Sequence, residues 1–265
     1  MKIGICSPPF GGQYEDALCA GSDYIEINNS SAFGWSEEEF LLAKENIKKN
    51  SLPVYSANCM FPGHFRLTGK DATSKEEREA FLEKSFSRIS ELGAVIAVLG
   101  SGRQRSVPEG ENANEFREKL FEIVRSVGLI AAKYGLTVAL EPLNRRETNV
   151  FNTLRETAEF VHKLNEKNVR LLADSYHMAA EREAYASAAN YSDVLVHAHF
   201  AEAEFGTANI RRTPTASDCL GSSEFVRALK ECGYSGNISL ECSLRTGDRR
   251  IDYIKAVEAL REWSR

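Results

Sequence analysis

Two short apolar segments of the sequence end abruptly on a glutamate. Residues 140–146 read LEPLNRR and place Glu141 after the apolar run, and residues 239–243 read SLECS and place Glu241 in the same way. A carboxylate at the end of a buried segment is costly unless it has a partner. A bound cation or a polar ligand would provide that partner, so both glutamates are candidates for chemistry.

Two further apolar runs end on residues of the same kind, Asp174 in LLADSYHM and His199 in LVHAHF. Each residue alone is most often a helix cap, an ion-pair partner or a satisfied histidine. Three carboxylates and one imidazole together, however, need a cation to offset their charge, and this donor set suits a divalent ion. We therefore expect one divalent metal ion, Mn²⁺ first, with Mg²⁺, Co²⁺ and Zn²⁺ also compatible. His197 lies two residues before His199 and on the same strand face, where it would be a core residue or a hydrogen-bonding partner of the ligand shell.

Eight short runs rich in Val, Ile and Leu position these residues. They are continuous rather than alternating, which is typical of strands buried on both faces: 2–6, 24–27, 54–57, 95–99, 137–140, 169–173, 194–198 and 238–240. Amphipathic helical segments lie between them, three of which begin with a capping-box pattern at Ser36, Ser74 and Thr153. Glycines at 93, 135 and 233 precede the next strand, as helix ends often require.

Eight strand and helix units in 265 residues predict a single (β/α)₈ TIM barrel of the α/β class, spanning residues 1–265 as one domain. No GxGxxG segment follows the first strand and no Walker-type loop is present, which disfavours an open nucleotide-binding sheet. The carboxyl ends of the strands in such a barrel meet at one rim. Strands five to eight would bring Glu141, Asp174, His199 and Glu241 together there.

Composition narrows the class of partner. The formal net charge is −5, which argues against broad binding of a nucleic-acid backbone. The first residues lack the pattern of a secretory leader, and the longest aliphatic run, AVIAVL, is far too short for a membrane span. The six cysteines form no CxxC pair, so we expect reduced, structural thiols in a cytoplasmic protein.

These motifs resemble those of the sugar phosphate isomerase/epimerase superfamily, the xylose isomerase-like TIM barrels. The likeness covers nearly the whole chain and is greatest to D-tagatose/D-psicose 3-epimerases and hydroxypyruvate isomerases. The family pattern E-P-x-N-R-x-E is met by residues 141–147, D-x-x-H-M by residues 174–178, and G-S-G-x-x-R-x-x-P-x-G by residues 100–110, with Arg105 in the arginine place. The strand-eight glutamate of the family falls on Glu241.

One segment departs from the family pattern. After the strand-seven histidine the epimerases read H-x-G-E-x-N-R, and their arginine contacts the substrate. This chain keeps Glu202 but has Phe205 in the arginine place, and the pair Arg211 and Arg212 follows several residues later. We expect either that Arg211 or Arg212 folds back over the pocket or that the substrate needs no arginine there.

The resemblance implies that Glu141 and Glu241 are both metal ligands and the catalytic acid/base pair. Moving a proton beside a sugar carbonyl passes through an enediolate, which a Lewis-acidic metal stabilises while one group removes a proton and another returns it. Return to the opposite face gives epimerisation, and return to the neighbouring carbon gives aldose–ketose isomerisation.

Other residues are candidates for substrate binding. Glu147 and His177 match family residues that hydrogen-bond the substrate, and Glu202 is retained beside them. His64 lies on the loop after the third strand and could reach the pocket, although we favour a plain loop residue. Trp35 and Phe61 would offer apolar walls for a sugar or else pack in the core.

The leading hypothesis is a metal-dependent isomerase or epimerase of a small keto sugar or a related hydroxy-carbonyl compound. A dehydratase or lyase is the main alternative, of inosose, dehydroshikimate or carbon-glycoside type, because these also remove a proton beside a carbonyl. An abasic-site endonuclease fits five histidines and an acidic pI poorly, and a metal-free binding protein would not need all four ligands. The expected partner is a small carbohydrate, without nucleic acid or membrane, and a homodimer or homotetramer is compatible with the sequence.

Overall fold

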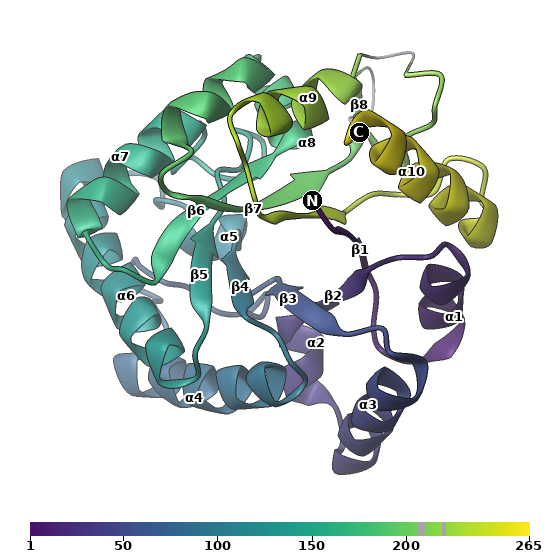
Figure 1. Ribbon diagram of the computed structural model, residues 1–265. Coiled ribbons are helices and arrows are strands. Elements are labelled where there is room, and N and C mark those ends of the chain that lie inside the picture. Colours follow the sequence, from purple (N-terminus) through teal and green to yellow (C-terminus); the bar gives the residue numbers. More distant parts are fainter. Residues whose placement is uncertain (206–209, 219–220) are drawn as a thin grey trace.

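The computed structural model describes residues 1–205, 210–218 and 221–265. Eight parallel strands close into a barrel in the order β1-β10-β7-β6-β5-β4-β3-β2, and the helices surround it (Figure 1). The barrel strands are β1 (Ile3–Cys6), β2 (Tyr24–Asn28), β3 (Val54–Asn58), β4 (Ile96–Leu99), β5 (Thr137–Leu140), β6 (Val169–Asp174), β7 (Leu195–Phe200) and β10 (Asn237–Leu240). The predicted (β/α)₈ fold is confirmed.

The larger helices cover the outside of the barrel. They are α1 (Gly11–Cys19), α3 (Glu37–Asn50), α4 (Lys75–Glu91), α6 (Ala113–Lys133), α7 (Leu154–Leu164), α9 (Ser223–Glu231) and α10 (Arg249–Trp263), with the 3₁₀ helix η1 (Tyr185–Tyr191) before β7. The Ser36 capping box is complete, because the Ser36 and Glu39 side chains each accept from the other's backbone N–H. Ser74 and Thr153 also cap their helices. The box at Thr153 is incomplete, because the Glu156 carboxylate accepts from the N–H of Asn152 and not from that of Thr153.

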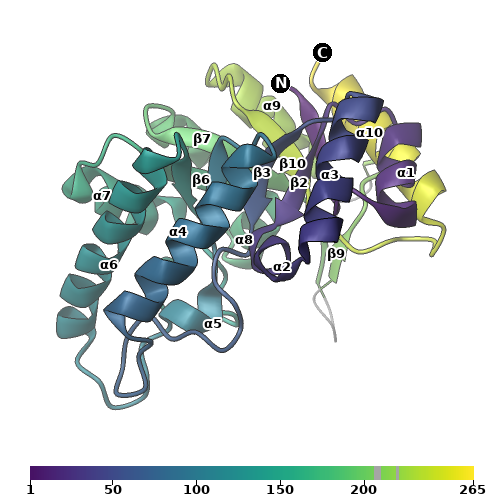
Figure 2. The ribbon, with the colours of Figure 1, turned by 90° about the horizontal axis from the view of Figure 1, so that it is seen from below.

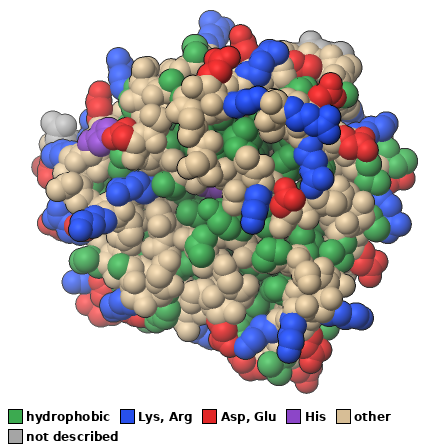
Figure 3. All heavy atoms as spheres, in the orientation of Figure 1, with side chains coloured by type: hydrophobic (Ala, Val, Ile, Leu, Met, Phe, Trp, Pro, Cys, Tyr) green, Lys and Arg blue, Asp and Glu red, His purple; other side chains and the backbone are tan. Residues whose placement is uncertain are grey.

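The loops at the carboxyl ends of the strands carry short elements that the sequence patterns did not predict. These are the helices α2 (Asn29–Gly34), α5 (Gly102–Arg105) and α8 (Ser175–Ala180) and the antiparallel hairpin of β8 (Glu202–Glu204) and β9 (Ile210–Arg212). Figure 2 shows α5 and β9 at the end of the barrel opposite the two chain termini. The end seen in Figure 3, which has the orientation of Figure 1, carries most of its charged side chains around the periphery.

Strand alternation divides the buried residues into two layers. Between the sheet and the helices lies the large apolar core, which includes Ala97, Leu99, Leu140, Ala173 and Ala198. Inside the barrel a smaller cluster of Ile96, Val98, Ala139 and Leu172 fills the lower part. The next inward positions toward the rim are no longer apolar, and they form the site described below.

The structure bears on two further expectations, the membrane span and the cysteines. No helix within the described ranges is both long and apolar enough to cross a bilayer. Cys6, Cys19, Cys59, Cys232 and Cys242 are free thiols, as expected for reduced cysteines. Cys219 lies outside the described residues.

Candidate metal centre and active site

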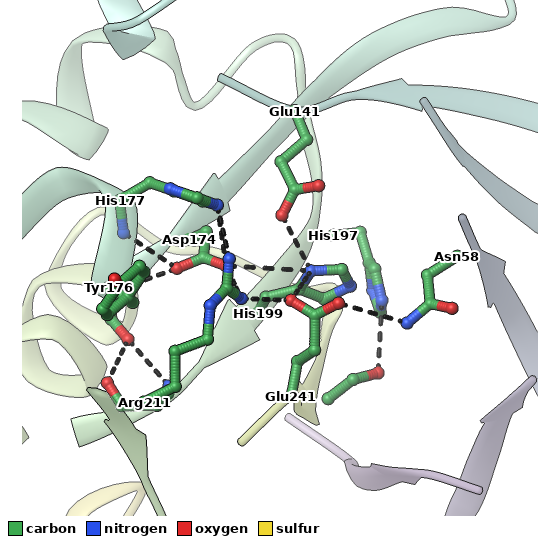
Figure 4. Close-up of polar contacts among 12 residues, drawn as sticks. Asn58, Glu141, Asp174, Tyr176, His177, His197, His199, Arg211 and Glu241 are labelled. Carbon is green, nitrogen blue, oxygen red and sulfur yellow. Dashed lines mark hydrogen bonds and ion pairs between the residues drawn. The ribbon is translucent and has the colours of Figure 1, made fainter. Parts of the chain in front are cut away.

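Four side chains converge at the carboxyl rim of the barrel. Glu141, Asp174, His199 and Glu241 each offer one ligand atom, and these atoms all lie within 4.8 Å of one another (Figure 4). They come from β5 to β10 in spatial succession, and the register places His199 beside both Asp174 and Ser239. Each continues the inward face of its strand, because it lies two residues beyond an inward-facing Ala139, Leu172, His197 or Ser239. The four residues that the sequence placed at successive strand ends therefore form one cluster in the structure.

The cluster has the character that a divalent cation requires. Glu141, Asp174 and His199 are 5%, 1% and 0% exposed, and Glu241 is partly buried. His199 Nδ1 is 2.9 Å from Glu141 Oε1 and 3.5 Å from Glu241 Oε2. Three carboxylates in such a space repel one another, and oxygen with one imidazole nitrogen is the donor set of Mn²⁺, Mg²⁺, Co²⁺ or Zn²⁺. The residues present thus fit one divalent ion.

Backbone contacts hold the ligands in place. Asp174 is the N-cap of α8, and its Oδ1 accepts from the N–H groups of Tyr176 and His177 at 2.7 and 3.1 Å, which leaves Oδ2 for the cluster. The Arg105 side chain is fully buried and donates to the carbonyl oxygens of Leu99 and Glu141 at 3.0 and 2.7 Å. The arginine of the fourth-strand motif therefore supports the strand end that carries Glu141.

Burial and neighbouring charges give Glu141 and Glu241 different pKa values. Burial raises the pKa of Glu141 to about 7 despite the opposing effect of His199. Burial would also raise the pKa of Glu241, but the Arg211 guanidinium and His199 outweigh it and lower that pKa to about 2. Without a metal, one carboxyl group is therefore ionised near neutral pH while the other can hold a proton.

Arg211 lies in the same pocket. It reaches the cluster from β9, where its carbonyl accepts from the N–H of Ser243 at 2.8 Å, so the β8–β9 hairpin is joined to the end of β10. Its guanidinium contacts Glu241, lies 3.2 Å from Asp174 Oδ2 and stacks 4.5 Å from the Tyr176 ring. Arg212 turns elsewhere and pairs with Glu204 at 3.1 Å. Of the two candidate arginines, Arg211 is the one placed over the cluster.

His177 lies beside Arg211 at the edge of the cluster. The backbone N–H of Asn144 donates to its Nδ1 at 3.0 Å. Burial lowers the pKa of His177, which keeps the ring neutral. Its Nε2 is 2.6 Å from Arg211 Nη2. Because a guanidinium can only donate, this contact holds the Arg211 side chain against the His177 ring.

A cavity of about 390 Å³ opens beside the cluster, a volume in the range of small-molecule sites. Glu147 and Phe61 are part of its wall, and Glu147 accepts from Asn144 Nδ2 at 3.0 Å. The wall also contains uncharged polar residues, namely Asn28, Ser30, Asn58, Ser101 and Gln104.

Five predicted substrate-binding residues are not part of this cavity wall: His177 and Arg212, described above, and Glu202, Trp35 and His64. Glu202 is buried and pairs with Arg245. Trp35 packs edge-on against Phe10 with ring centroids 5.1 Å apart. His64 is exposed and packs on Phe65 beside a separate groove, as favoured for a plain loop residue.

Sequence reasoning missed the uncharged polar residues of the cavity wall and two residues that contact the candidate metal ligands, Glu26 and Asn58. Glu26 lies in the middle of β2, is 1% exposed and contacts both His197 and His199. Asn58 ends β3 and its Nδ2 lies 3.3 Å from Glu241 Oε1. Glu26 lies inside the apolar run YIEI and could have been recognised as a buried charge in the same way as Glu141. It was missed because only residues at strand ends were considered.

Comparison with known proteins places the chain in a family. Residues 14–263 match the family model described as xylose isomerase-like TIM barrel, and the chain belongs to that family. The D-psicose 3-epimerase of Agrobacterium fabrum is 25% identical over 91% of this chain and 82% of its own length. The 3-dehydro-D-guloside 4-epimerase of Escherichia coli is 27% identical over 91% and 90%.

Solved structures agree on the fold. The crystal structure of a 3-keto-D-glucoside 4-epimerase from E. coli superposes with a TM-score of 0.80 at 23% identity and covers 99% of both chains. A D-allulose 3-epimerase from Methylomonas sp., in complex with D-allulose, has a TM-score of 0.80 at 22% identity, with 99% of this chain and 96% of that one covered.

Proposed function

We propose that the protein is a divalent-metal-dependent epimerase or isomerase of a small keto sugar. The observation that carries the proposal is the buried cluster of Glu141, Asp174, His199 and Glu241 beside a cavity of about 390 Å³. Relatives that are 25–28% identical include a D-psicose 3-epimerase, an L-ribulose 3-epimerase and a 3-dehydro-D-guloside 4-epimerase, whose names all describe inversion at a carbon next to a carbonyl. A metal held by the four ligands would supply Lewis-acid stabilisation of negative charge on the substrate oxygens.

The two glutamates would move the proton. Glu141 and Glu241 reach the cluster from different strands, β5 and β10. One carboxylate can therefore remove the C–H proton next to the carbonyl while the other carboxyl group returns a proton. In the reverse direction the roles exchange, as they must for a reversible epimerisation.

Arg211, held by His177 at 2.6 Å, would bind the carbonyl side of the substrate. Its guanidinium lines the cavity and can only donate, so it can stabilise the negative charge that develops on oxygen as the enediolate forms. Glu147, an acceptor at the cavity wall, suits a substrate hydroxyl. Arg211 would thereby take the place of the family arginine, although it comes from β9 and not from the position of Phe205.

The experiment is a substrate screen with Mn²⁺-loaded protein in deuterated water, read by NMR. Ketohexoses, ketopentoses, hydroxypyruvate and inosose are the test compounds. We expect an epimer or isomer of a ketose with one solvent deuterium at the carbon next to the carbonyl. Loss of water from inosose would support the dehydratase alternative instead. Absence of deuterium from every compound would reject the proposal.

A further inference from the structure

Glu26 lies directly beneath the candidate metal ligands, inside the barrel. Its Oε1 is 2.8 Å from His199 Nε2. Its Oε2 is 2.7 Å from His197 Nε2 and accepts from the hydroxyl groups of Ser56 and Ser239 at 2.5 and 2.6 Å. All four neighbours are donors, so the carboxylate acts only as an acceptor and its hydrogen-bonding capacity is used.

The contact with Glu26 decides which nitrogen of His199 is available. An imidazole nitrogen that donates to a carboxylate cannot also ligate a metal, so Nε2 carries the proton and the lone pair remains on Nδ1. That nitrogen faces the cluster, 2.9 Å from Glu141 Oε1, 3.5 Å from Glu241 Oε2 and 3.9 Å from Asp174 Oδ2. We infer that Glu26 is a positioning residue that fixes the tautomer and ring orientation of His199, so that the metal binds at Nδ1.

The same atoms admit a different interpretation, because Glu26, His197 and His199 could themselves hold a cation. Two features argue against that second site. Glu26 Oε2 already accepts from two hydroxyl groups, and one carboxylate carries far less charge to neutralise than the three at the rim. Each His199 nitrogen can take part in only one of the two clusters. A hydrogen bond from Nε2 to Glu26 together with metal binding at Nδ1 uses both nitrogens and requires only one metal ion.

An isosteric change tests this assignment sharply. In Glu26→Gln the amide has one acceptor and one donor end. The amide can be oriented in two ways. More hydrogen bonds are kept when its oxygen takes the place of Oε2 and faces the three donors there, so we expect its NH₂ group to face His199. There it meets Nε2 as a donor and favours the tautomer with the proton on Nδ1, where the metal should bind. The matched control is Ser56→Ala, which removes one donor to Oε2 and leaves the His199 contact intact.

The inference rests on the metal centre of the proposed function, and the measurements separate the two. Mn²⁺ and Zn²⁺ dissociation constants are measured by calorimetry for the wild type, Glu26→Gln and Ser56→Ala. The hydrogen-bonding partner of a metal-ligating histidine is typically worth 10–100-fold in affinity, so we expect a loss of about that size in Glu26→Gln and affinity within about threefold of wild type in Ser56→Ala. Wild-type protein that binds neither metal would overturn the metal centre itself, whereas equal binding by wild type and Glu26→Gln would overturn only the role of Glu26.

A second measurement is made on the wild-type protein and therefore does not depend on the folding of Glu26→Gln. Long-range ¹H–¹⁵N spectra of Zn²⁺-loaded wild-type protein report the five imidazoles, assigned by single histidine substitutions. We expect His199 to show a slowly exchanging, strongly deshielded Nε2–H and a metal-bound Nδ1. A His199 ring that binds zinc through Nε2, or carries its proton on Nδ1, would contradict the inference.

Discussion

Arg211 shows how a single residue can take over a role from a different point of the chain. Phe205, in the arginine place of the family pattern, is half exposed and stacks on the Tyr176 ring at 6.2 Å. The Arg211 guanidinium also lies over the Tyr176 ring, 4.5 Å from its centroid. The arginine reaches Asp174 and Glu241 because the hairpin turns the chain back toward the end of β10.

The first prediction concerns this arginine. Arg211→Ala should lower kcat/KM for the ketose by about 10–100-fold, since a lost hydrogen bond to a charged group costs about 1.5–3 kcal/mol. In the metal-free protein it should also raise the pKa of Glu241, because Arg211 is the main charge that lowers it; an NMR titration of the carboxyl group measures this shift. Arg212→Ala is the control and should change little, since Arg212 pairs with Glu204. Equal effects of the two substitutions would remove Arg211 from the substrate site.

At the level of elements, the end of β4 leaves room for the ligand on β5. A Cβ atom added to Gly100 would lie 2.4 Å from Glu141 Oε2, so the Glu141 carboxylate occupies the space that a larger residue would fill. The fourth-strand motif thus contributes twice to Glu141, through the absent side chain of Gly100 and through the hydrogen bond of Arg105 to its carbonyl.

The second prediction follows from that space. Gly100→Ala should push the flexible end of Glu141 aside, which weakens metal binding by about tenfold or more while the fold survives, because a side-chain tip yields more cheaply than backbone. Calorimetric metal titration together with thermal unfolding measures both quantities. Gly34→Ala is the control, since its new Cβ would meet nothing within 4 Å. Unchanged metal affinity in Gly100→Ala would show that Glu141 is not a ligand in the orientation described.

At the scale of the whole molecule, the barrel depends on pairing the first and last parts of the chain. Strand β1 pairs with β10 as well as with β2, with Ile3 opposite Ile238. Outside the sheet, Asp16 on α1 accepts from Arg249 and Arg250 on α10, both at 2.8 Å. These contacts fasten the last helix against the first one.

The third prediction concerns the pH dependence of that closure. Burial opposes ionisation of Asp16, but the hydrogen bonds from Arg250 and Arg249 outweigh it and lower its pKa below 3.8. A carboxyl group with a lowered folded-state pKa stabilises the protein above its unfolded pKa, and that contribution is lost as the pH falls through the folded pKa. Asp16→Asn should therefore lower the Tm by about 2–4 °C at pH 7, the shift that a loss of about 1 kcal/mol gives in a chain of this size, and by less as the pH approaches 3. A Tm difference that stays constant between pH 7 and pH 3 would show that the ion pairs do not contribute.

The sequence predicted the barrel and the cluster for physical reasons that also explain what it missed. Continuous Val, Ile and Leu runs identify strands buried on both faces, and parallel strands must end at one rim, so Glu141, Asp174, His199 and Glu241 could be brought together without coordinates. Glu26 was missed because a mid-strand position gives no rim signal. Trp35 and Glu202 follow strand ends in the sequence, but their side chains pack on Phe10 and pair with Arg245. The direction of a side chain beyond a strand end depends on loop geometry, which the hydrophobic pattern of the sequence does not predict.

The central claim is that Glu141 and Glu241 transfer protons as well as bind metal. The most direct measurement follows ketose turnover and solvent deuterium exchange by Glu141→Gln and Glu241→Gln at saturating Mn²⁺, where the amide oxygen can still ligate the ion but cannot act as a base. We expect turnover in both variants to fall by about 10²–10⁴-fold, the usual cost of losing general acid–base catalysis. The variant that keeps the abstracting group should still exchange the C–H proton with solvent without inversion, and the other should exchange nothing. Full recovery of turnover in both variants by added metal would contradict the claim, because the two carboxylates would then be ligands only.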